Sequence, residues 1–147
     1  MKIAYALALL LLPTSCGSAP YPHDPLLEGY LRQWNAEFKR DFDVVLVIDS
    51  TKIKPGHDGN VILADCLIDE DKPPVITVYT KTWGKETDLK KEAVLYHEFG
   101  HCDLHLDHDI RVGSDLCPVS LMYPLIPPKD CYSKHRSDYM DLLRKAM

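Results

Sequence analysis

The sequence predicts one small α+β domain in which helices and strands are not regularly alternated. Two observations support this class. The chain has 147 residues, of which 46% are hydrophobic, so it has room for a single modest core. Its apolar pattern gives one helix, three strands and then two further helices, without βαβ alternation. We expect a signal peptide at residues 1–15, a tether at 16–24 and a single domain at 25–147.

The N-terminal segment has the features of an export signal. Lys2 is followed by a largely apolar run, Ile3–Leu12, which is too short to span a bilayer but long enough for a signal-peptide core. The residues Leu-Pro-Thr-Ser before Cys16 resemble a bacterial lipoprotein signal, which would leave Cys16 lipidated. The alternative is cleavage near Ala19 and secretion. We therefore expect an exported protein, lipid-anchored to a bacterial membrane and facing the periplasm or the exterior, or else secreted.

The cysteines agree with export. There are five, and an odd number leaves one without a partner in an oxidising compartment. If Cys16 carries lipid, four remain, which is enough for two disulfides. Several pairings are possible, and we take Cys66–Cys102 with Cys117–Cys131 as the expected one. Free, buried cysteines are the alternative.

The first half of the chain predicts a helix and a sheet. Apolar residues at helical spacing follow Pro25, at Leu27, Tyr30, Leu31, Trp34 and Phe38. Three apolar runs predict strands, at Phe42–Ile48, Val61–Ile68 and Val75–Thr80. The turn Lys54–Asn60 and the charged loop Asp69–Pro74 separate these strands. Because prolines come directly before the third strand, we expect that strand at the edge of the sheet.

The second half predicts a buried helix and a closing helix. A long helix is expected from Asp88 to Leu104, with Thr87 or Asp88 as its cap. Its middle, Ala93–Phe99, is apolar on nearly all sides, so the helix should be buried. The rest is rich in proline and should be mostly loop, until a short helix near Ser137–Lys145.

The buried helix carries the pattern HExxH, as His97-Glu98-Phe99-Gly100-His101. Histidines four residues apart lie on the same helix face, close enough to share one metal ion. Glu98 lies beside them, where its carboxylate can reach a water on the metal without binding the metal. A shared ion gives these polar groups a partner inside a buried helix. The alternative is a pair of ordinary core histidines with hydrogen-bond partners.

A third ligand must come from farther along the chain, because a catalytic zinc usually has three protein ligands and a water. Glu98 is the last glutamate of the sequence, which excludes a downstream glutamate. In a continued helix His105 would lie about 12 Å along the axis from His97, too far to share an ion. We therefore expect the helix to end and His105 to occupy a turn with positive φ. His108 then becomes the expected third ligand, with Asp107 as the alternative.

These residues resemble the metzincin signature HExxHxxGxxH. The segment His97–His108 is one residue longer than that signature and lacks its glycine. Farther on, Ser120-Leu121-Met122-Tyr123-Pro124 resembles the Met-turn of the same clan. The resemblance implies a compact, matrixin-like zinc metallopeptidase with a zincin/metzincin-like fold. It also implies that Met122 lies beneath the metal without binding it, and that Tyr123 and Pro124 help to wall the substrate pocket.

The expected function is hydrolysis of peptide bonds, by an endopeptidase, through a glutamate-assisted, zinc-bound water. His97, His101 and His108 would hold Zn²⁺, and Glu98 would take the water's proton and deliver it to the leaving amine. By resemblance, the strand Val75–Thr80 would pair with an extended substrate.

The composition of the chain limits the classes of molecule that we expect it to bind. The net charge of −5 argues against nucleic acid as a main partner. We expect a monomer that acts on a peptide or protein substrate and touches a membrane only through an N-terminal lipid. One alternative function is an exported, surface-anchored binding protein whose zinc is structural and not catalytic. An iron or manganese site suits three imidazoles less well.

Overall fold

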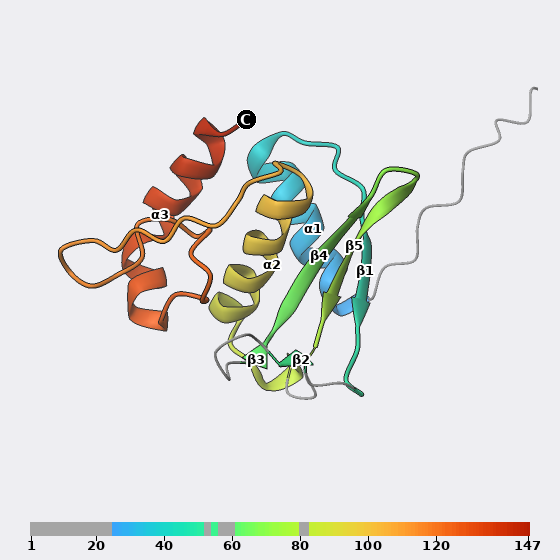
Figure 1. The fold of residues 1–147 in the computed structure, drawn as a ribbon, viewed down its shortest axis with the longest axis horizontal. Coiled ribbons are helices and arrows are strands. Elements are labelled where there is room, and N and C mark those ends of the chain that lie inside the picture. The colour runs from blue at the N-terminus through green and yellow to red at the C-terminus, as the bar shows by residue number, and fades with distance from the viewer. Residues whose placement is uncertain (1–24, 52–53, 56–60, 80–82) are drawn as a thin grey trace, which may run out of the picture.

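The fold is α+β, with three α-helices and a mixed sheet (Figure 1). The structure is a computed structural model that describes residues 25–51, 54–55, 61–79 and 83–147. The expected signal peptide, the tether and the lipidation site Cys16 lie outside the described residues. The elements in chain order are α1 (Pro25–Phe38), β1 (Val45–Ile48), β2 (Lys54–Pro55), β3 (Val61–Ile62), β4 (Ala64–Asp69), β5 (Lys72–Val78), the 3-10 helix η1 (Trp83–Lys85), α2 (Asp88–Cys102) and α3 (Lys129–Lys145).

The main sheet has three strands in the order β1-β5-β4. β1 runs parallel to β5, with Val45 opposite Val75, and β4 runs antiparallel to β5, with Cys66 opposite Ile76. β2 and β3 form a separate antiparallel pair. Figure 1 shows that both helices α1 and α2 lie on one side of this sheet and that α3 packs beyond α2. The arrangement places α2 in the middle of the molecule, as its apolar sequence predicted.

The expectation that the third strand lies at the edge is wrong, because β5 is the central strand. Its prolines, Pro73 and Pro74, precede Val75, which is the first residue paired with β1. A missing proline N–H therefore costs no hydrogen bond to β1. The strand that lies at the edge and beside α2 is β4. The register between β4 and β5 also shifts near the prolines, between Leu67 and Asp69.

The core lies between the sheet and the helices. Trp34 of α1 is fully buried and packs edge-on against Tyr96 of α2, with 5.2 Å between the ring centroids. Its indole Nε1 donates a 2.8 Å hydrogen bond to Asp103, which also pairs with Arg40. Burying a large apolar side chain stabilises the fold by roughly 1.5–3 kcal/mol. The four buried side chains of α1 are Leu27, Leu31, Trp34 and Phe38, all of them at the predicted helical spacing.

The helices differ from the sequence prediction mainly at their ends. α1 begins at Pro25 as predicted, and Thr87 caps α2 by accepting a hydrogen bond from the Lys90 amide. α2 ends at Cys102, slightly before the predicted Leu104. α3 begins at Lys129, much earlier than predicted, because the prolines that suggested a loop all precede its first turn. No helix within the described ranges is long and apolar enough to cross a membrane.

Both expected disulfides are present. Cys66–Cys102 joins the edge strand β4 to the end of α2, and Cys117–Cys131 joins the loop before α3 to its first turn. Each bridge links segments that are distant in sequence, so each removes freedom from the unfolded chain. The domain is small, and bridges of this kind supplement a core of limited size.

Candidate metal centre

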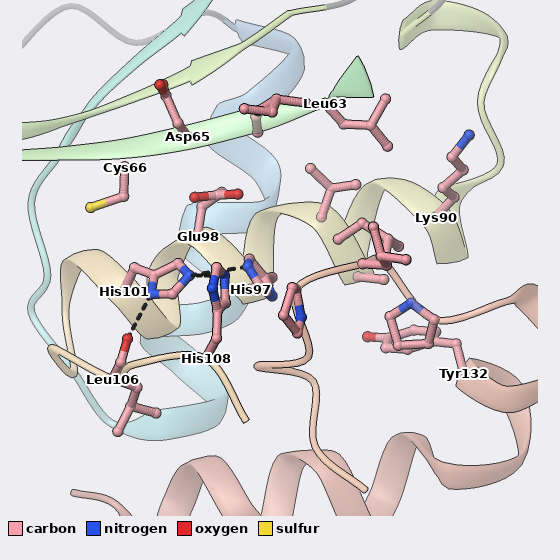
Figure 2. A pocket seen from close by; sticks show the side chains of 18 of the residues that line it. Leu63, Asp65, Cys66, Lys90, His97, Glu98, His101, Leu106, His108 and Tyr132 are labelled. Carbon is pink, nitrogen blue, oxygen red and sulfur yellow. Dashed lines mark hydrogen bonds between the residues drawn. The ribbon is translucent and has the colours of Figure 1, made fainter. Parts of the chain in front are cut away.

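Three imidazoles converge on one point beside α2. The Nε2 atom of His101 lies 3.0 Å from Nε2 of His97 and 3.2 Å from Nε2 of His108. Figure 2 shows the three rings side by side, two from α2 and one from the chain that returns after it. Two nitrogens bound to the same tetrahedral zinc, each about 2.0–2.1 Å from it, lie about 3.3 Å apart. The observed spacing is close to that value, so the three residues fit one such ion.

The chain reversal that returns His108 depends on the turn predicted at His105. The backbone of His105 has φ 53°, which is the left-handed region. The amide of Leu106 then donates to the Gly100 carbonyl at 3.1 Å and closes the end of α2. His108 therefore joins the histidine cluster. The alternative ligand Asp107 lines the adjoining cleft, but it does not belong to that cluster.

Backbone carbonyls orient two of the rings. Nδ1 of His97 lies 2.8 Å from the Leu121 carbonyl oxygen, and Nδ1 of His101 lies 2.6 Å from that of Leu106. A carbonyl oxygen only accepts, so each Nδ1 must carry the hydrogen. In a neutral ring this leaves the lone pair on Nε2, directed at the common point. Neither carbonyl was foreseen from the sequence.

The surroundings favour the neutral form of these rings. Burial lowers the pKa of His97 to about 4, an effect that its hydrogen bond to Leu121 opposes and that the neighbouring His101 and His108 reinforce. Burial also lowers the pKa of His101. Near pH 7 both imidazoles are therefore uncharged, which is the form that binds a metal.

Glu98 is buried next to the cluster, with 5% of its surface exposed. Figure 2 shows its carboxylate between the imidazoles and β4. Burial raises its pKa to about 8, and the Asp65 carboxylate adds to this rise, while a hydrogen bond from the Cys66 backbone and the charge of Lys54 oppose it. Glu98 is not a member of the metal-binding group. It can therefore exchange a proton near neutral pH without occupying a coordination position.

A cleft of about 1200 Å³ opens beside this group. α2 forms its floor, and the walls are the strands β3 and β4 on one side and the chain from Pro124 to Lys129 on the other. Pro124 lines the cleft as expected from the resemblance, whereas Tyr123 is half-buried and is not among the residues that line it. The apolar members of the lining include Leu63, Ala93, Val94, Leu125, Ile126 and Tyr132.

Met122 lies beneath the histidine helix. It is buried, and a Cβ placed on Gly100 would come within 2.4 Å of its Sδ atom. The Ser120 hydroxyl accepts from the Met122 amide, and the Met122 carbonyl accepts from the Asp109 amide at 2.8 Å. These bonds join the turn at 120–123 to the residue after His108. The segment therefore packs against the helix that carries the histidine cluster.

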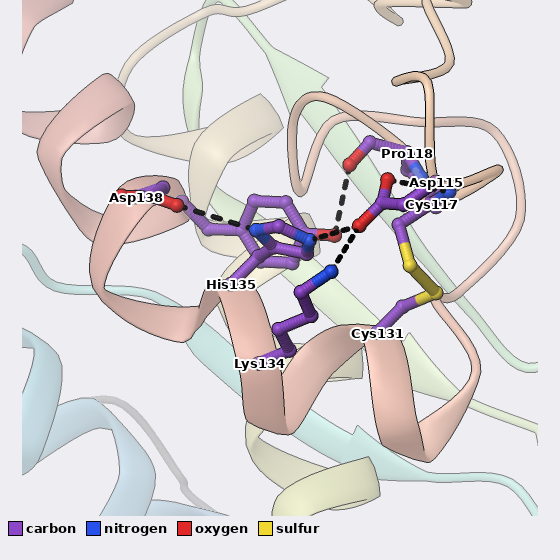
Figure 3. The surroundings of a disulfide bond; sticks show 8 residues. Asp115, Cys117, Pro118, Cys131, Lys134, His135 and Asp138 are labelled. Atoms are coloured by element: carbon purple, nitrogen blue, oxygen red, sulfur yellow. Dashed lines mark hydrogen bonds and ion pairs between the residues drawn. A yellow bond between two sulfur atoms is a disulfide. The ribbon is translucent and has the colours of Figure 1, made fainter.

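A second group of possible ligands lies near α3, made of Asp115, Cys117 and His135. Figure 3 shows that its donors already have partners. Cys117 is in the disulfide with Cys131, and the Asp115 carboxylate accepts from Lys134 at 2.6 Å and contacts His135 at 2.7 Å. Hydrogen bonds with Lys134 and His135 hold the pKa of Asp115 well below its usual range. The group fastens the loop before α3 to that helix, and we do not assign a metal to it.

Comparison of the chain with known proteins identifies no relative. No protein-family model, curated protein or solved structure matches the chain. The function must therefore be inferred from the three imidazoles, the neighbouring carboxyl group and the cleft.

Proposed function

We propose that the protein is a zinc-dependent peptidase with a zincin/metzincin-like active site. The observation that carries this proposal is the convergence of three Nε2 atoms beside the buried carboxyl group of Glu98, on the floor of an open cleft. Within the described ranges, no fourth His, Cys, Asp or Glu joins the cluster. Three protein ligands with an open position are the usual pattern of a catalytic zinc site, whereas structural sites are closed by a fourth ligand.

The donor set suits zinc. Neutral imidazoles bind Zn²⁺ well, and the carbonyl partners of His97 and His101 fix the tautomer that presents Nε2. His108 supplies the third nitrogen from the returning chain. When bound, Zn²⁺ would supply a Lewis acid that lowers the pKa of a water molecule and polarises a substrate carbonyl.

Glu98 is the proposed general base and acid. Its carboxylate would take a proton from the attacking water and pass it to the amine of the leaving peptide. The Cys66 backbone lies on the strand beside this carboxyl group (Figure 2) and partly opposes the rise in its pKa. Such proton transfer contributes roughly 10²–10⁴-fold to the rate of an enzyme.

The substrate would lie along β4, in place of the strand that the sequence suggested. In the described sheet β4 pairs only with β5, so its other edge is available. Ala64, Cys66 and Ile68 of β4 line the cleft beside the metal centre. An extended peptide can add to such an edge by main-chain hydrogen bonds, while its side chains enter pockets. The apolar lining of the cleft suits an apolar side chain of the substrate.

The expected location agrees with this chemistry. Two disulfides are typical of an oxidising compartment outside the cytoplasm. An enzyme anchored there through a lipid on Cys16 would meet peptides and unfolded proteins at the membrane surface.

The test is hydrolysis of a labelled unfolded protein by the purified mature protein. We compare the zinc-loaded, chelator-treated and zinc-restored enzyme with two variants. Glu98→Gln keeps the shape of the side chain and should lower kcat by at least about 10²-fold with no loss of bound zinc. Glu70→Gln removes an exposed carboxylate in the β4–β5 hairpin and should leave kcat unchanged. Activity that survives both chelation and Glu98→Gln would refute the proposal.

A further inference from the structure

Cys66 joins β4 to α2 and lies beside the proposed base. Its sulfur is bonded to Cys102, which directly follows the proposed ligand His101 in the chain. Figure 2 shows Cys66 on the strand directly beside Glu98 and His101. A single residue of the edge strand is therefore fastened to the end of the segment that holds the base and a metal ligand.

The free edge of β4 lies beside this bridge. The Tyr79 amide donates to the Leu63 carbonyl across the β4–β5 pair, so Leu63, Asp65 and Leu67 direct their backbone groups toward β5. Those of Ala64 and Cys66 point away from β5, because the backbone groups of alternate residues in a strand point to the same side. Both residues line the cleft. Their backbone groups are the ones that an added peptide strand would use.

The remaining contacts between β4 and α2 do not fix this spacing as tightly. Ala64 faces the buried side of the sheet, and contacts of that kind are apolar and not directional. The pairing of β4 with β5 becomes irregular between Leu67 and Asp69. The bridge, in contrast, sets the Cα atoms of Cys66 and Cys102 at 5.7 Å.

We infer that Cys66 is a positioning residue, which through its bridge to Cys102 sets the distance and register between the peptide-binding edge of β4 and the metal-binding histidines. This inference rests on the proposed function. It assigns a role in substrate placement to a disulfide that would otherwise serve stability alone. It also predicts that the two disulfides of the chain have different consequences for ligand binding.

The experiment compares Cys66→Ala/Cys102→Ala with Cys117→Ala/Cys131→Ala, each made in the full chain, matured and loaded with zinc. Two probes are titrated by calorimetry. Acetohydroxamate binds the metal alone, whereas a peptide hydroxamate long enough to pair with β4 binds the metal and the strand together. We expect all proteins to bind acetohydroxamate within about twofold of one another. The peptide hydroxamate should lose at least about ten-fold in affinity only in the Cys66/Cys102 variant, which corresponds to about 1.4 kcal/mol.

Other outcomes overturn the inference. Equal losses of peptide hydroxamate affinity in both variants, or none in either, would make Cys66–Cys102 a stability element only. A wild-type protein that binds the peptide probe no better than acetohydroxamate would exclude pairing with β4. Failure of the proposed function is separate, because a wild-type protein that shows the expected binding pattern but no hydrolysis would disprove the peptidase activity and retain the positioning role.

A variant that does not fold is also informative. If circular dichroism shows that the alanine pair is unfolded, Cys66→Val/Cys102→Ala replaces it, since valine retains more of the apolar volume. If this pair also fails to fold with zinc present, while Cys117→Ala/Cys131→Ala folds, the bridge is required for the fold and the positioning role is rejected.

Discussion

Met122 lies so close to Gly100 that the glycine of the HExxH segment could not carry a side chain without a shift, since a Cβ there would meet Met122 Sδ at 2.4 Å. Gly100 lies between Glu98 and His101 on α2 and is itself buried. The sulfur of the methionine occupies the space that a side chain at position 100 would need. A long loop separates these two residues in the sequence, yet they are in contact within the helix segment that carries His97 and His101.

Gly100→Ala should lower the stability of the fold. Alanine favours a helix interior by about 1 kcal/mol over glycine. The new methyl group must displace a buried Met122 side chain, and such overpacking costs roughly 1–3 kcal/mol. We expect a net loss, measured as the free energy of unfolding in urea. In a protein that already carries Met122→Ala, adding Gly100→Ala should be neutral or stabilising relative to that single variant, because the space is then free.

The double-mutant cycle gives the control. A coupling free energy between positions 100 and 122 of at least about 0.5 kcal/mol is expected for residues in contact. Additive effects of the two substitutions would show that Met122 does not pack on Gly100 in solution.

His108 and Asp107 should differ sharply in their effect on metal affinity. The Nε2 atom of His108 lies with those of the other two histidines, whereas Asp107 is exposed and outside the cluster. His108→Ala should weaken zinc binding by more than the 10–100-fold that is typical for loss of an outer-shell group, and Asp107→Ala by less. Competition with a chromophoric chelator measures both. A larger loss for Asp107→Ala than for His108→Ala would make the aspartate the third ligand.

Much of the site could be predicted because its signals are local. The HExxH pattern, the cap at Thr87 and the helical spacing after Pro25 each act within a few residues, and α1 and α2 begin where they were expected. The positive φ of His105 followed from a distance argument, since a helix that continued would have carried this residue out of reach of the metal.

The remainder depends on contacts between distant segments. The order of the strands could not be obtained from prolines alone, because Pro73 and Pro74 lie outside the stretch that β1 pairs with. The carbonyl oxygens of Leu106 and Leu121 orient the rings of His101 and His97, but every residue has a carbonyl, so no residue type in the sequence indicates these contacts. The early start of α3 was not predicted, because proline is compatible both with a loop and with the residue before a helix.

Glu98→Gln should stabilise the metal-free protein near neutral pH. The pKa of Glu98 is raised to about 8, above the usual 4.5, mainly by burial. A carboxyl group with a raised folded-state pKa contributes stability below pH 4.5, and this contribution is lost as the pH rises toward 8. Glutamine does not titrate. The variant's advantage should therefore grow across this interval and reach on the order of 3 kcal/mol at pH 7.

Urea unfolding of the metal-free proteins at pH 5 and pH 7 measures this difference. His97 is present in both proteins, so its own titration cancels in the comparison. An advantage of Glu98→Gln that is absent at pH 7, or that is larger at pH 5, would show that the carboxylate is not buried as described.

In the proposed site, three imidazoles hold one metal ion and leave one coordination position open. Zinc K-edge X-ray absorption of the protein loaded with one equivalent of zinc tests it most directly. We predict three imidazole nitrogens at about 2.0–2.1 Å and one further light-atom ligand supplied by water. In His108→Ala one imidazole should disappear from the spectrum. A zinc ligand set that contains sulfur, a spectrum unchanged by His108→Ala, or the absence of stoichiometric binding would rule out this three-histidine site.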